Sequence, residues 1–436
     1  MIRYASVLLG VLAVSACSTT SRPDGRAPVA LESAPVSAAI DYPVASASGP
    51  ADLAWLAVRH HPSLKAARHR AERLAQKAPQ ERSLPDPVLE VSAGSMAETA
   101  AGRVDGMGGV KQKIPFPGKR SSAAAAADSE AAAAREDVMA LELKLTEQVH
   151  AAWWDLYLAE ETIRISRENR TVLEDLRGVI DARVAADEAA QADQLRLAGE
   201  ISLVDRDIAD ADRLRGTARA RLNSLLNRPA GASLPSAARS RVPSAGSLDS
   251  LLAAAEANHP EVTAAQRRAD AFRHRLKRAE LEKFPDFTAG VVGASVSDSG
   301  LSGVANGRDQ VYATLGINIP LWQEPRRAMI REAREGISET ESMVAAARSD
   351  LRYRVEDAWY RAKTAREVVR LFETRLIPDA RQAYEVTLAG YSSGKSTYTD
   401  LMETWQGLLG YRLQLAKNRA LVGKATATLR AAAGIR

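Results

Sequence analysis

Two long runs of helical pattern dominate the sequence. The first extends from Lys119 to Arg183, begins after Pro117 and contains no proline, so nothing in its backbone prevents a continuous α-helix. At the rise of an α-helix its residues would extend roughly 98 Å, a length that no compact domain needs. The second run extends from Glu324 to Ala389. Both runs are therefore expected to form long helical hairpins and not a globular core.

One face of the second run carries apolar residues at alternating steps of four and three positions. These residues are Leu351, Val355, Ala358, Ala362, Ala365, Val369, Phe372 and Leu376. This spacing keeps a single seam turned toward a partner helix. It predicts coiled-coil packing and carries no information on chemistry.

Shorter elements surround the first long helix. The pattern predicts a helix over Ala51–Arg82, strands over Val88–Ser95 and Gly109–Ile114, and a further helix over Ala189–Asn227. The two short helices together contain about as many residues as the long helix, so at the same rise they match its length. Stacked end to end, they can run alongside it.

The same order of elements is expected in the second half of the chain, because the sequence repeats itself. Four short motifs recur in unchanged order about 200 residues later. The pairs are His61-Pro62 with His259-Pro260, Leu84-Pro85-Asp86 with Phe284-Pro285-Asp286, Ile114-Pro115-Phe116 with Ile319-Pro320-Leu321, and Ala152-Trp153 with Ala358-Trp359. We therefore divide the chain into repeat 1 at residues 51–230, a linker at 231–247 and repeat 2 at 248–436.

The predicted strands alternate between apolar and polar residues. In the fourth strand Val311, Ala313, Leu315, Ile317 and Ile319 share one face, and Tyr312, Thr314, Gly316 and Asn318 share the other. This alternation is typical of a half-buried strand in a soluble sheet, or of a barrel strand between lipid and water. The chain offers no evident soluble partner for four apolar strand faces, which favours the membrane.

The membrane interpretation has a consequence for assembly. Open strand edges are not tolerated in lipid, and four strands are too few to close a transmembrane barrel. Three chains that supply twelve strands are therefore expected. Phe116 and Trp322 stand where strands pass into helices, which suits an aromatic belt at the membrane boundary.

Composition and charge narrow the possible functions. Aromatic residues make up only 5% of the chain and the net charge is +5. Most arginines are interleaved with acids at helical spacing, as at Arg196, Glu200 and Arg206, a pattern that favours a solvated helix face over a nucleic-acid patch. The single cysteine excludes an intramolecular disulfide framework and any CxxC metal site.

The N-terminus has the pattern of a secretory signal. Residues 1–16 carry one positive charge followed by an apolar stretch too short to span a bilayer. The stretch ends in Val14-Ser15-Ala16-Cys17, which resembles a bacterial lipobox, so Cys17 is expected to be lipidated; the alternative is a buried free cysteine after ordinary cleavage. Residues 17–50 are rich in Ser, Pro, Ala and Gly and are interpreted as a tether. Ser18 resembles the sorting position of lipoproteins destined for the outer membrane.

Taken in order, these motifs resemble the TolC family of outer-membrane efflux factors. The resemblance rests on the duplicated His-Pro helix starts, the Pro-Asp strand entries, the two Ile-Pro strand exits, and the turn that holds Tyr391, Gly394 and Asp400. It implies a mainly α-helical homotrimer with a long periplasmic α-barrel and a twelve-stranded transmembrane β-barrel. It also implies two partners, a periplasmic adaptor and an inner-membrane pump of the RND type. Pro117-Gly118-Lys119-Arg120 looks more like the heavy-metal branch that includes CzcC and CusC.

The sequence offers no catalytic constellation and no cofactor or metal site. HExxH, GxSxG and P-loop motifs do not occur, and the adjacent His60 and His61 diverge on a helix. His61 and His259 instead precede prolines at equivalent places in the two repeats, which favours a structural role. The protein is therefore expected not to be an enzyme.

Candidate control residues lie at the turns between long and short helices. They are Arg183, Asp187, Asp193, Tyr391, Lys395 and Asp400. In a trimer each charge would recur three times around a narrow axis, where acids select cations and ion pairs hold an entrance shut. The alternative is ordinary helix capping, in which Asp and Gly are common.

Three functions remain open after this reading. The first is a passive exit duct for heavy-metal cations in the outer membrane. The second is the same kind of duct for drugs or for type I protein secretion. The third, from another class, is a periplasmic coiled-coil scaffold that forms no pore.

Overall fold

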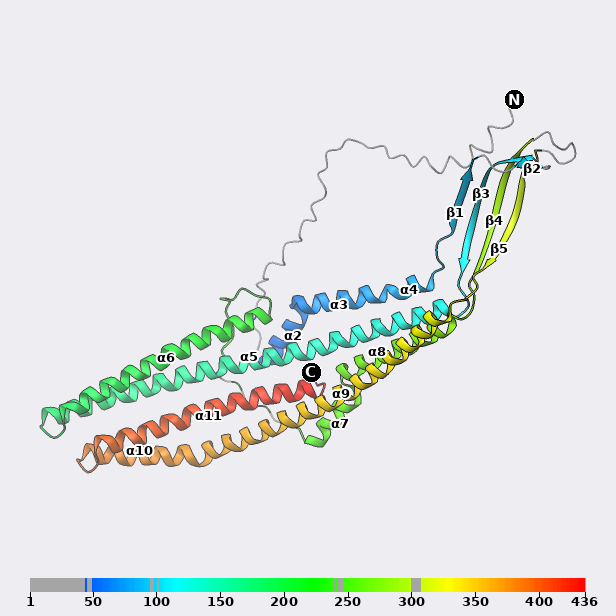
Figure 1. Ribbon diagram of the computed structural model, residues 1–436. Coiled ribbons are helices and arrows are strands. Elements are labelled where there is room, and N and C mark those ends of the chain that lie inside the picture. The colour runs from blue at the N-terminus through cyan, green and yellow to red at the C-terminus, as the bar shows by residue number, and fades with distance from the viewer. Residues whose placement is uncertain are drawn as a thin grey trace, which may run out of the picture. The chain divides into compact units, whose positions relative to one another are not determined.

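The computed structural model describes residues 44, 49–94, 98–99, 102–238, 240, 243, 246–298 and 307–435. The first half contains α2 (Pro50–His60), α3 (Pro62–Ala75), α4 (Lys77–Arg82), β1 (Val88–Ala93), β2 (Glu98–Thr99), β3 (Gly102–Ile114), α5 (Lys119–Ala185) and α6 (Gln191–Leu225). The second half contains α7 (Leu248–Asn258), α8 (Pro260–Leu281), β4 (Phe287–Ser297), β5 (Gln310–Ile317), α9 (Gln323–Leu371), the π-helical turn η1 (Phe372–Leu376), α10 (Ile377–Ser392) and α11 (Tyr398–Ala432). Figure 1 shows these elements with the same labels.

The predicted single helix over Ala51–Arg82 is wrong, because the chain forms three helices there. His61 has an extended backbone, with φ −66° and ψ 127°, and Pro62 opens α3. A residue that precedes proline is sterically pushed out of the α region, so the helix ends and restarts. The Nδ1 atom of His61 then accepts a hydrogen bond from the Ser63 N–H at 3.3 Å. His259 caps α8 in the same way through the Glu261 N–H, which confirms the structural role expected of both histidines.

The second predicted strand, Gly109–Ile114, is too short. The strand β3 begins at Gly102 and pairs with β4 along almost its whole length. Glycine lowers strand propensity, so the pattern does not predict the first half of the strand, which contains Gly106 and Gly108. The close approach of β4 explains a further glycine, because a Cβ at position 109 would lie 2.7 Å from the Val291 carbonyl oxygen.

The sheet has the order β1-β3-β4-β5, all antiparallel, with β2 paired to β3. Its register aligns apolar side chains into rows across the strands. One such row is Leu89, Val110, Val291 and Ala313. The apolar side chains of the two end strands are exposed on this face, where Leu89 is 66% exposed and Leu315 is 79% exposed. The opposite face carries the Lys111–Glu90 ion pair. It also carries Val292, Ala294 and Val296 of β4, which are buried, so the expected alternation between an apolar and a polar face does not hold in β4.

The helix α5 is the central element of the helical region. It packs against α3 and α4 toward the strands and against α6 in the other direction, as Figure 1 shows, and it also contacts α8 and α11. The two sets of shorter helices therefore do run alongside it. In α9 the predicted seam is buried from Leu351 to Val369, whereas Phe372 and Leu376 lie half-buried in the π-helical turn.

The π-helical turn divides the second long run, which the sequence pattern predicts as one helix from Glu324 to Ala389. Pro378 stands at the start of α10 and cannot donate a backbone hydrogen bond to the preceding turn. Widened turns of this kind absorb such a defect without ending the helix. The direction of the chain therefore continues from α9 into α10.

The linker between the repeats is bound to α5. The Glu160 carboxylate accepts hydrogen bonds from the Ser236 hydroxyl at 2.7 Å and from the backbone N–H groups of Ala237 at 2.8 Å and Ala238 at 3.1 Å. The Trp153 indole donates to the Ser240 hydroxyl at 2.8 Å. These bonds hold repeat 1 and the start of the linker together.

In the described part of the chain, no helix combines the length and the apolar character that a membrane span requires.

Candidate functional sites at the helix tips and at the strand ends

The hairpin tips are the turn from α5 to α6 and the turn from α10 to α11. Asp187 occupies the left-handed region with φ 61° in the first turn, and Gly394 does so with φ 77° in the second. Such a conformation is rare for a residue with a side chain, though aspartate is among those that adopt it. Asp187 is therefore fixed by the geometry of the turn, and its side chain is exposed.

Arg183 joins the two tips. Its Nη1 donates a hydrogen bond to the Tyr391 carbonyl oxygen, and its guanidinium lies over the Tyr391 ring at 4.6 Å from the centroid. Its Nη2 donates to the Glu188 carbonyl oxygen at 3.1 Å. Hydrogen bonds from a charged donor are among the stronger ones in proteins. One side chain thus binds the second tip while it also closes its own turn.

An apolar core lies directly behind this contact. The first hairpin contributes Leu173, Leu176, Ile180, Leu197 and Val204, and the second contributes Tyr391, Tyr398, Leu401, Met402 and Trp405. All ten are buried. The two hairpins of one chain are therefore packed together at their tips by hydrophobic contact as well as by Arg183.

Three polar atoms in this core lack hydrogen-bond partners among the described residues. They are the hydroxyls of Tyr391 and Tyr398 and the indole nitrogen of Trp405. Burial, with smaller contributions from Glu200 and Asp193, raises the pKa of Tyr398 to about 12. Burial likewise raises the pKa of Tyr391. A buried polar group without a partner costs about 1–3 kcal/mol, so the packing between the hairpins is weaker than its buried area suggests.

The remaining predicted tip residues do not converge on one point. Asp193 lies 3.7 Å from Arg196 of the same helix, and the Lys395 side chain is exposed. Asp400 forms a capping box with Thr397, and hydrogen bonds from the Thr397 hydroxyl and N–H lower the pKa of its carboxyl. The structure therefore brings Arg183 and Tyr391 together and leaves the other charges at separate places on the tips.

Sequence reasoning missed Tyr398 and Trp405. Both lie on α11, at positions that continue the apolar spacing of Leu401 and Met402. A helical pattern read from Thr397 onward signals that they are buried. The pattern does not indicate that their polar atoms lack hydrogen-bond partners, because that depends on which residues of the other hairpin lie opposite them.

The strand ends form the second candidate site. Phe116, predicted to lie at a membrane boundary, stacks on Phe284 with ring centroids 4.5 Å apart. Trp322 is 78% exposed. Each residue stands in the segment between a strand and the following helix, as expected from the sequence.

A buried lysine organises the segments between strands and helices. Lys119 is 5% exposed, and its Nζ donates to the Asp286 carboxylate at 2.9 Å and to the Phe284 carbonyl oxygen at 3.0 Å. The Glu282 carboxylate lies 3.1 Å away. Lys119 belongs to repeat 1, whereas all three of its acceptors belong to repeat 2, so one ammonium group links the two repeats.

Asp286 extends this link to a third segment. Its carboxylate accepts a further hydrogen bond from the Phe116 N–H at 3.0 Å, and its backbone N–H donates to the Asn318 side-chain oxygen. Burial alone would raise the pKa of Asp286, but the hydrogen bonds from Lys119, Phe116 and Lys113 outweigh it and lower the pKa. Lys119 and Asp286 thus fix the chain where it leaves β3, enters β4 and leaves β5.

The described residues hold no group of three or more His, Cys, Asp or Glu side chains that is placed to bind a metal ion. His61 and His259 act as helix caps, and His60 lies in α2. Cys17, the predicted lipidation site, lies outside the described residues together with the signal and most of the tether.

Comparison with known proteins finds a family match in the second half of the chain. Residues 251–435 match the sequence model of the family described as outer membrane efflux protein. No curated protein sequence matches the chain at a significant level.

The fold is shared with solved structures at low sequence identity. The outer membrane protein VceC from Vibrio cholerae matches with a TM-score of 0.72 and 19% identity, over 88% of this chain and 96% of VceC. CusC, whose structures concern folding and transmembrane channel formation, matches with a TM-score of 0.72 and 15% identity, over 89% of this chain and 92% of CusC. The open state of the MtrE outer membrane channel from Neisseria gonorrhoeae matches with a TM-score of 0.70 and 19% identity, over 88% of this chain and 89% of MtrE. The second half of the chain is thus similar to the outer membrane efflux proteins, and the described part of the chain has the TolC-like fold of these solved structures.

Proposed function

We propose that this protein is the passive exit duct of a tripartite efflux system, formed by three copies of the chain. The observation that supports this most directly is the uncovered apolar face of the sheet, together with its two outer strands. Within the described residues, β1 and β5 each pair on one side only. Lipid tolerates neither open strand edges nor unpaired backbone groups, so the edge of β5 in one copy pairs with β1 of the next.

Closure of the ring follows from the number of strands. Known transmembrane barrels use about eight strands or more, and three copies of β1, β3, β4 and β5 supply twelve. A contact between unlike edges forms a closed ring when the rotation between copies closes. The apolar row that contains Leu89, Val110 and Val291 then faces lipid, and the face with Lys111 and Glu90 lines the pore.

The helices offer matching edges for the same ring. The outer helix of the first hairpin, α6, exposes Leu195 at 73%, and the outer helices of the second hairpin, α9 and α10, expose Tyr353 at 64% and Val386 at 66%. Exposed apolar side chains gathered on an element often mark an interface. Contact between α6 of one copy and α9 and α10 of its neighbour produces a helical barrel in the periplasm.

The tips are the proposed point of control. Arg183 and Tyr391 hold the hairpins of one copy together, while Asp187, Asp193, Lys395 and Asp400 are available to a periplasmic adaptor or to cations that enter. Energy comes from an inner-membrane pump of the RND type. Neutralising Asp187 and Asp193 together is expected to change single-channel conductance and block by divalent cations in a planar bilayer; unchanged values would count against control by these charges.

Heavy-metal cations are the proposed substrate class. The support is the Pro117-Gly118-Lys119-Arg120 segment after β3, which resembles the heavy-metal branch, and the similar fold of CusC. Deletion of the gene should increase sensitivity to copper, silver, zinc or cobalt more than sensitivity to dyes and antibiotics. A phenotype limited to drugs would instead favour the alternative of multidrug efflux, and a defect in secretion would favour type I protein export.

Two further experiments address location and class. Heat-modifiable trimers in the outer-membrane fraction are expected, whereas a periplasmic scaffold without a pore would give neither trimers there nor conductance. Anchoring at Cys17 is tested by labelling with radioactive palmitate. Label should enter the natural chain and be absent from a Cys17→Ala variant.

A further inference from the structure

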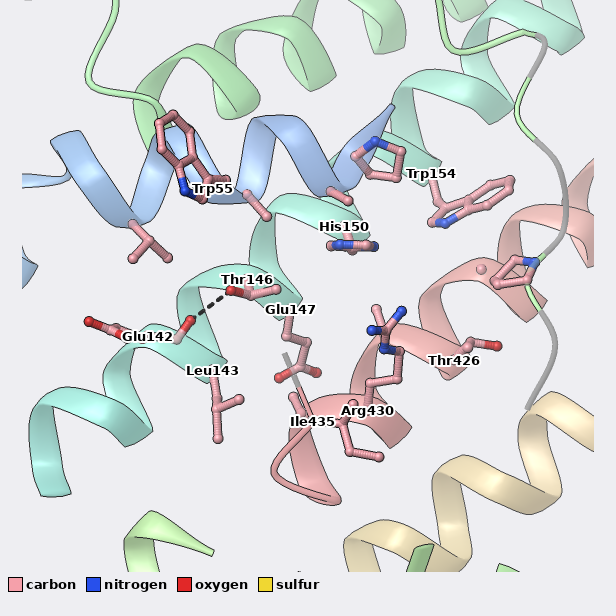
Figure 2. Close-up of a pocket in the computed structure, with 18 residues that line it drawn as sticks. Trp55, Glu142, Leu143, Thr146, Glu147, His150, Trp154, Thr426, Arg430 and Ile435 are labelled. Atoms are coloured by element: carbon pink, nitrogen blue, oxygen red, sulfur yellow. Dashed lines mark hydrogen bonds between the residues drawn. The ribbon is translucent and has the colours of Figure 1, made fainter. Parts of the chain in front are cut away.

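A cavity of about 290 Å³ lies within a single copy of the chain, between α2, α5 and α11. Protein interiors contain few voids larger than a water molecule, and this volume approaches that of sites for small molecules. Figure 2 shows the side chains around it, with Trp55 on α2, His150 on α5 and Arg430 on α11. The cavity is remote in sequence from the tips and from the strand ends.

The wall is built from large rings placed beside small residues. Trp154 forms one side and is 2% exposed, and Ala54 and Ala427 leave room next to it. Gly423 is required for this arrangement, because a Cβ at that position would overlap the Trp154 indole. Most of the remaining lining is apolar, including Val58, Leu143 and Ile435.

The two carboxylates of the wall each accept a hydrogen bond. The Glu142 carboxylate accepts a hydrogen bond from Arg68 at 2.9 Å, and the Glu147 carboxylate accepts one from the Thr428 hydroxyl at 2.7 Å. The Arg430 guanidinium is close enough to His150 to influence its protonation. Adding an ion to a partly open, mostly apolar space costs more than adding a neutral molecule.

His150 also lines the cavity. Its imidazole has no hydrogen-bond partner in the described ranges. Burial, assisted by Arg430, lowers its pKa to about 4. The ring is therefore neutral at pH 7 and offers one donor nitrogen and one acceptor nitrogen. Figure 2 shows the ring at the cavity, between Trp154 and Glu147.

We propose that this cavity binds a neutral, mostly apolar small molecule that carries one hydrogen-bonding group, with that group bound by His150. The apolar wall determines the class of ligand, the volume limits its size, and the cost of bringing an ion into the mostly apolar space disfavours a net charge. The site is separate from the proposed pore and from its tips. It holds a ligand whether or not the chain conducts metal cations.

The test uses two probes with one skeleton. N-phenyl-1-naphthylamine is a neutral bicyclic amine with a single N–H, and 8-anilinonaphthalene-1-sulfonate is the same skeleton with a sulfonate. The full-length chain, held in an amphipathic polymer, is titrated with each probe by equilibrium dialysis. The neutral probe should bind at one site per chain, and the anionic probe at least about tenfold more weakly, because of the cost of burying its charge.

Variants separate this site from general partitioning into the polymer. Ala427→Leu fills the cavity from α11, and Ala51→Leu narrows it from the exposed start of α2, where folding is not at risk. Both should lower the affinity for the neutral probe at least tenfold, whereas Ala66→Leu, at an exposed position of α3 outside the cavity, should leave it unchanged. His150→Phe keeps the ring and should weaken binding by about three- to tenfold, the value of one hydrogen bond.

The result that overturns the proposal is equally specific. If the neutral probe binds Ala51→Leu and the natural chain with equal affinity, and both melt at the same temperature, the cavity is not the site. If the sulfonate binds as tightly as the amine, the ligand class is wrong. Equal affinity of His150→Phe and the natural chain would show that the imidazole does not bind the ligand.

Discussion

Lys119 and Asp286 form an ion pair of 2.9 Å in which the lysine is 5% exposed and the aspartate 9% exposed. The two residues are 167 positions apart in the chain and belong to different repeats. Their contact joins the start of α5 to the start of β4. The pair thus binds the segment between β3 and α5 to the segment that leads from α8 into β4.

Replacing Lys119 by Met should destabilise the protein by about 2–4 kcal/mol. Removal of one partner of a buried pair leaves the other charge poorly compensated, although Lys113 and the Phe116 N–H still bind Asp286. The measurement is the thermal unfolding of the purified chain. Lys144→Met, at an exposed position of the same helix, is the control and should change stability by less than about 0.5 kcal/mol.

A double variant distinguishes the pair from its surroundings. Lys119→Met combined with Asp286→Leu removes both charges, so its loss of stability should be smaller than the sum of the two single losses. Strictly additive losses would contradict a direct interaction between the two side chains.

The sequence predicts the repeat and the long helices because both depend on local pattern. The seam from Leu351 to Val369 is buried as its spacing indicates, and the order of the motifs predicts two copies. The errors arise where a single residue overrides the pattern, as Pro62 does in the first helix and as Gly106 and Gly108 do in β3. A pattern averaged over ten or more residues does not register the effect of one such residue.

The sites were less predictable than the fold. Arg183 and Tyr391 lie at the hairpin tips, but their mutual contact depends on how the two hairpins pack, which no local pattern in the sequence indicates. The sequence marks Lys119 only as part of the segment Pro117-Gly118-Lys119-Arg120. Its partner Asp286 lies in the other repeat, and nothing in the spacing indicates that the two segments meet.

His150 predicts a pH dependence of stability. Its pKa is about 4 in the folded chain, against an ordinary value of 6.5, so the unfolded chain binds the proton more tightly. Stability should therefore be full above pH 6.5 and fall as the pH drops toward 4, by up to about 3 kcal/mol from this residue. Glu142, Glu147 and Arg430 share the cavity wall with His150.

The contribution of His150 to the pH dependence of stability is obtained by comparing the natural chain with a variant that lacks this imidazole. His150→Gln cannot titrate and should lose less stability than the natural chain between pH 7 and pH 4. His69→Gln, at an exposed position of α3, should follow the natural chain. Parallel curves for the natural chain and His150→Gln, measured by denaturant unfolding, would exclude the predicted effect.

Tyr398→Phe should stabilise the protein, which is unusual for a change in a core. The hydroxyl it removes is buried without a partner in the described part of the chain, and such a group costs about 1–3 kcal/mol. Tyr411→Phe, at a residue of α11 that is 37% exposed, should have no effect. A decrease in the unfolding temperature of Tyr398→Phe would show that the hydroxyl is bound in solution.

The same variant has a signature at high pH. The raised pKa of Tyr398, about 12 against an ordinary 10, means that the unfolded chain ionises first. The natural chain should therefore lose stability from this residue as the pH rises from 10 toward 12. Tyr398→Phe lacks that loss, so its advantage over the natural chain should grow across this interval.

Arg183→Ala should loosen the tips and raise channel conductance. It removes the hydrogen bonds to Tyr391 and Glu188 and the contact with the Tyr391 ring, and hydrogen bonds from a charged group contribute about 1.5–3 kcal/mol. Arg183→Lys keeps the charge but loses the planar fork, so it should give an intermediate conductance. The measurement is single-channel current in a planar bilayer, with Arg177→Ala, two turns away in α5 and 64% exposed, as the control. Conductance of Arg183→Ala equal to that of the control would mean that closure of the duct does not depend on this side chain, and that the two hairpins are held by their apolar core alone.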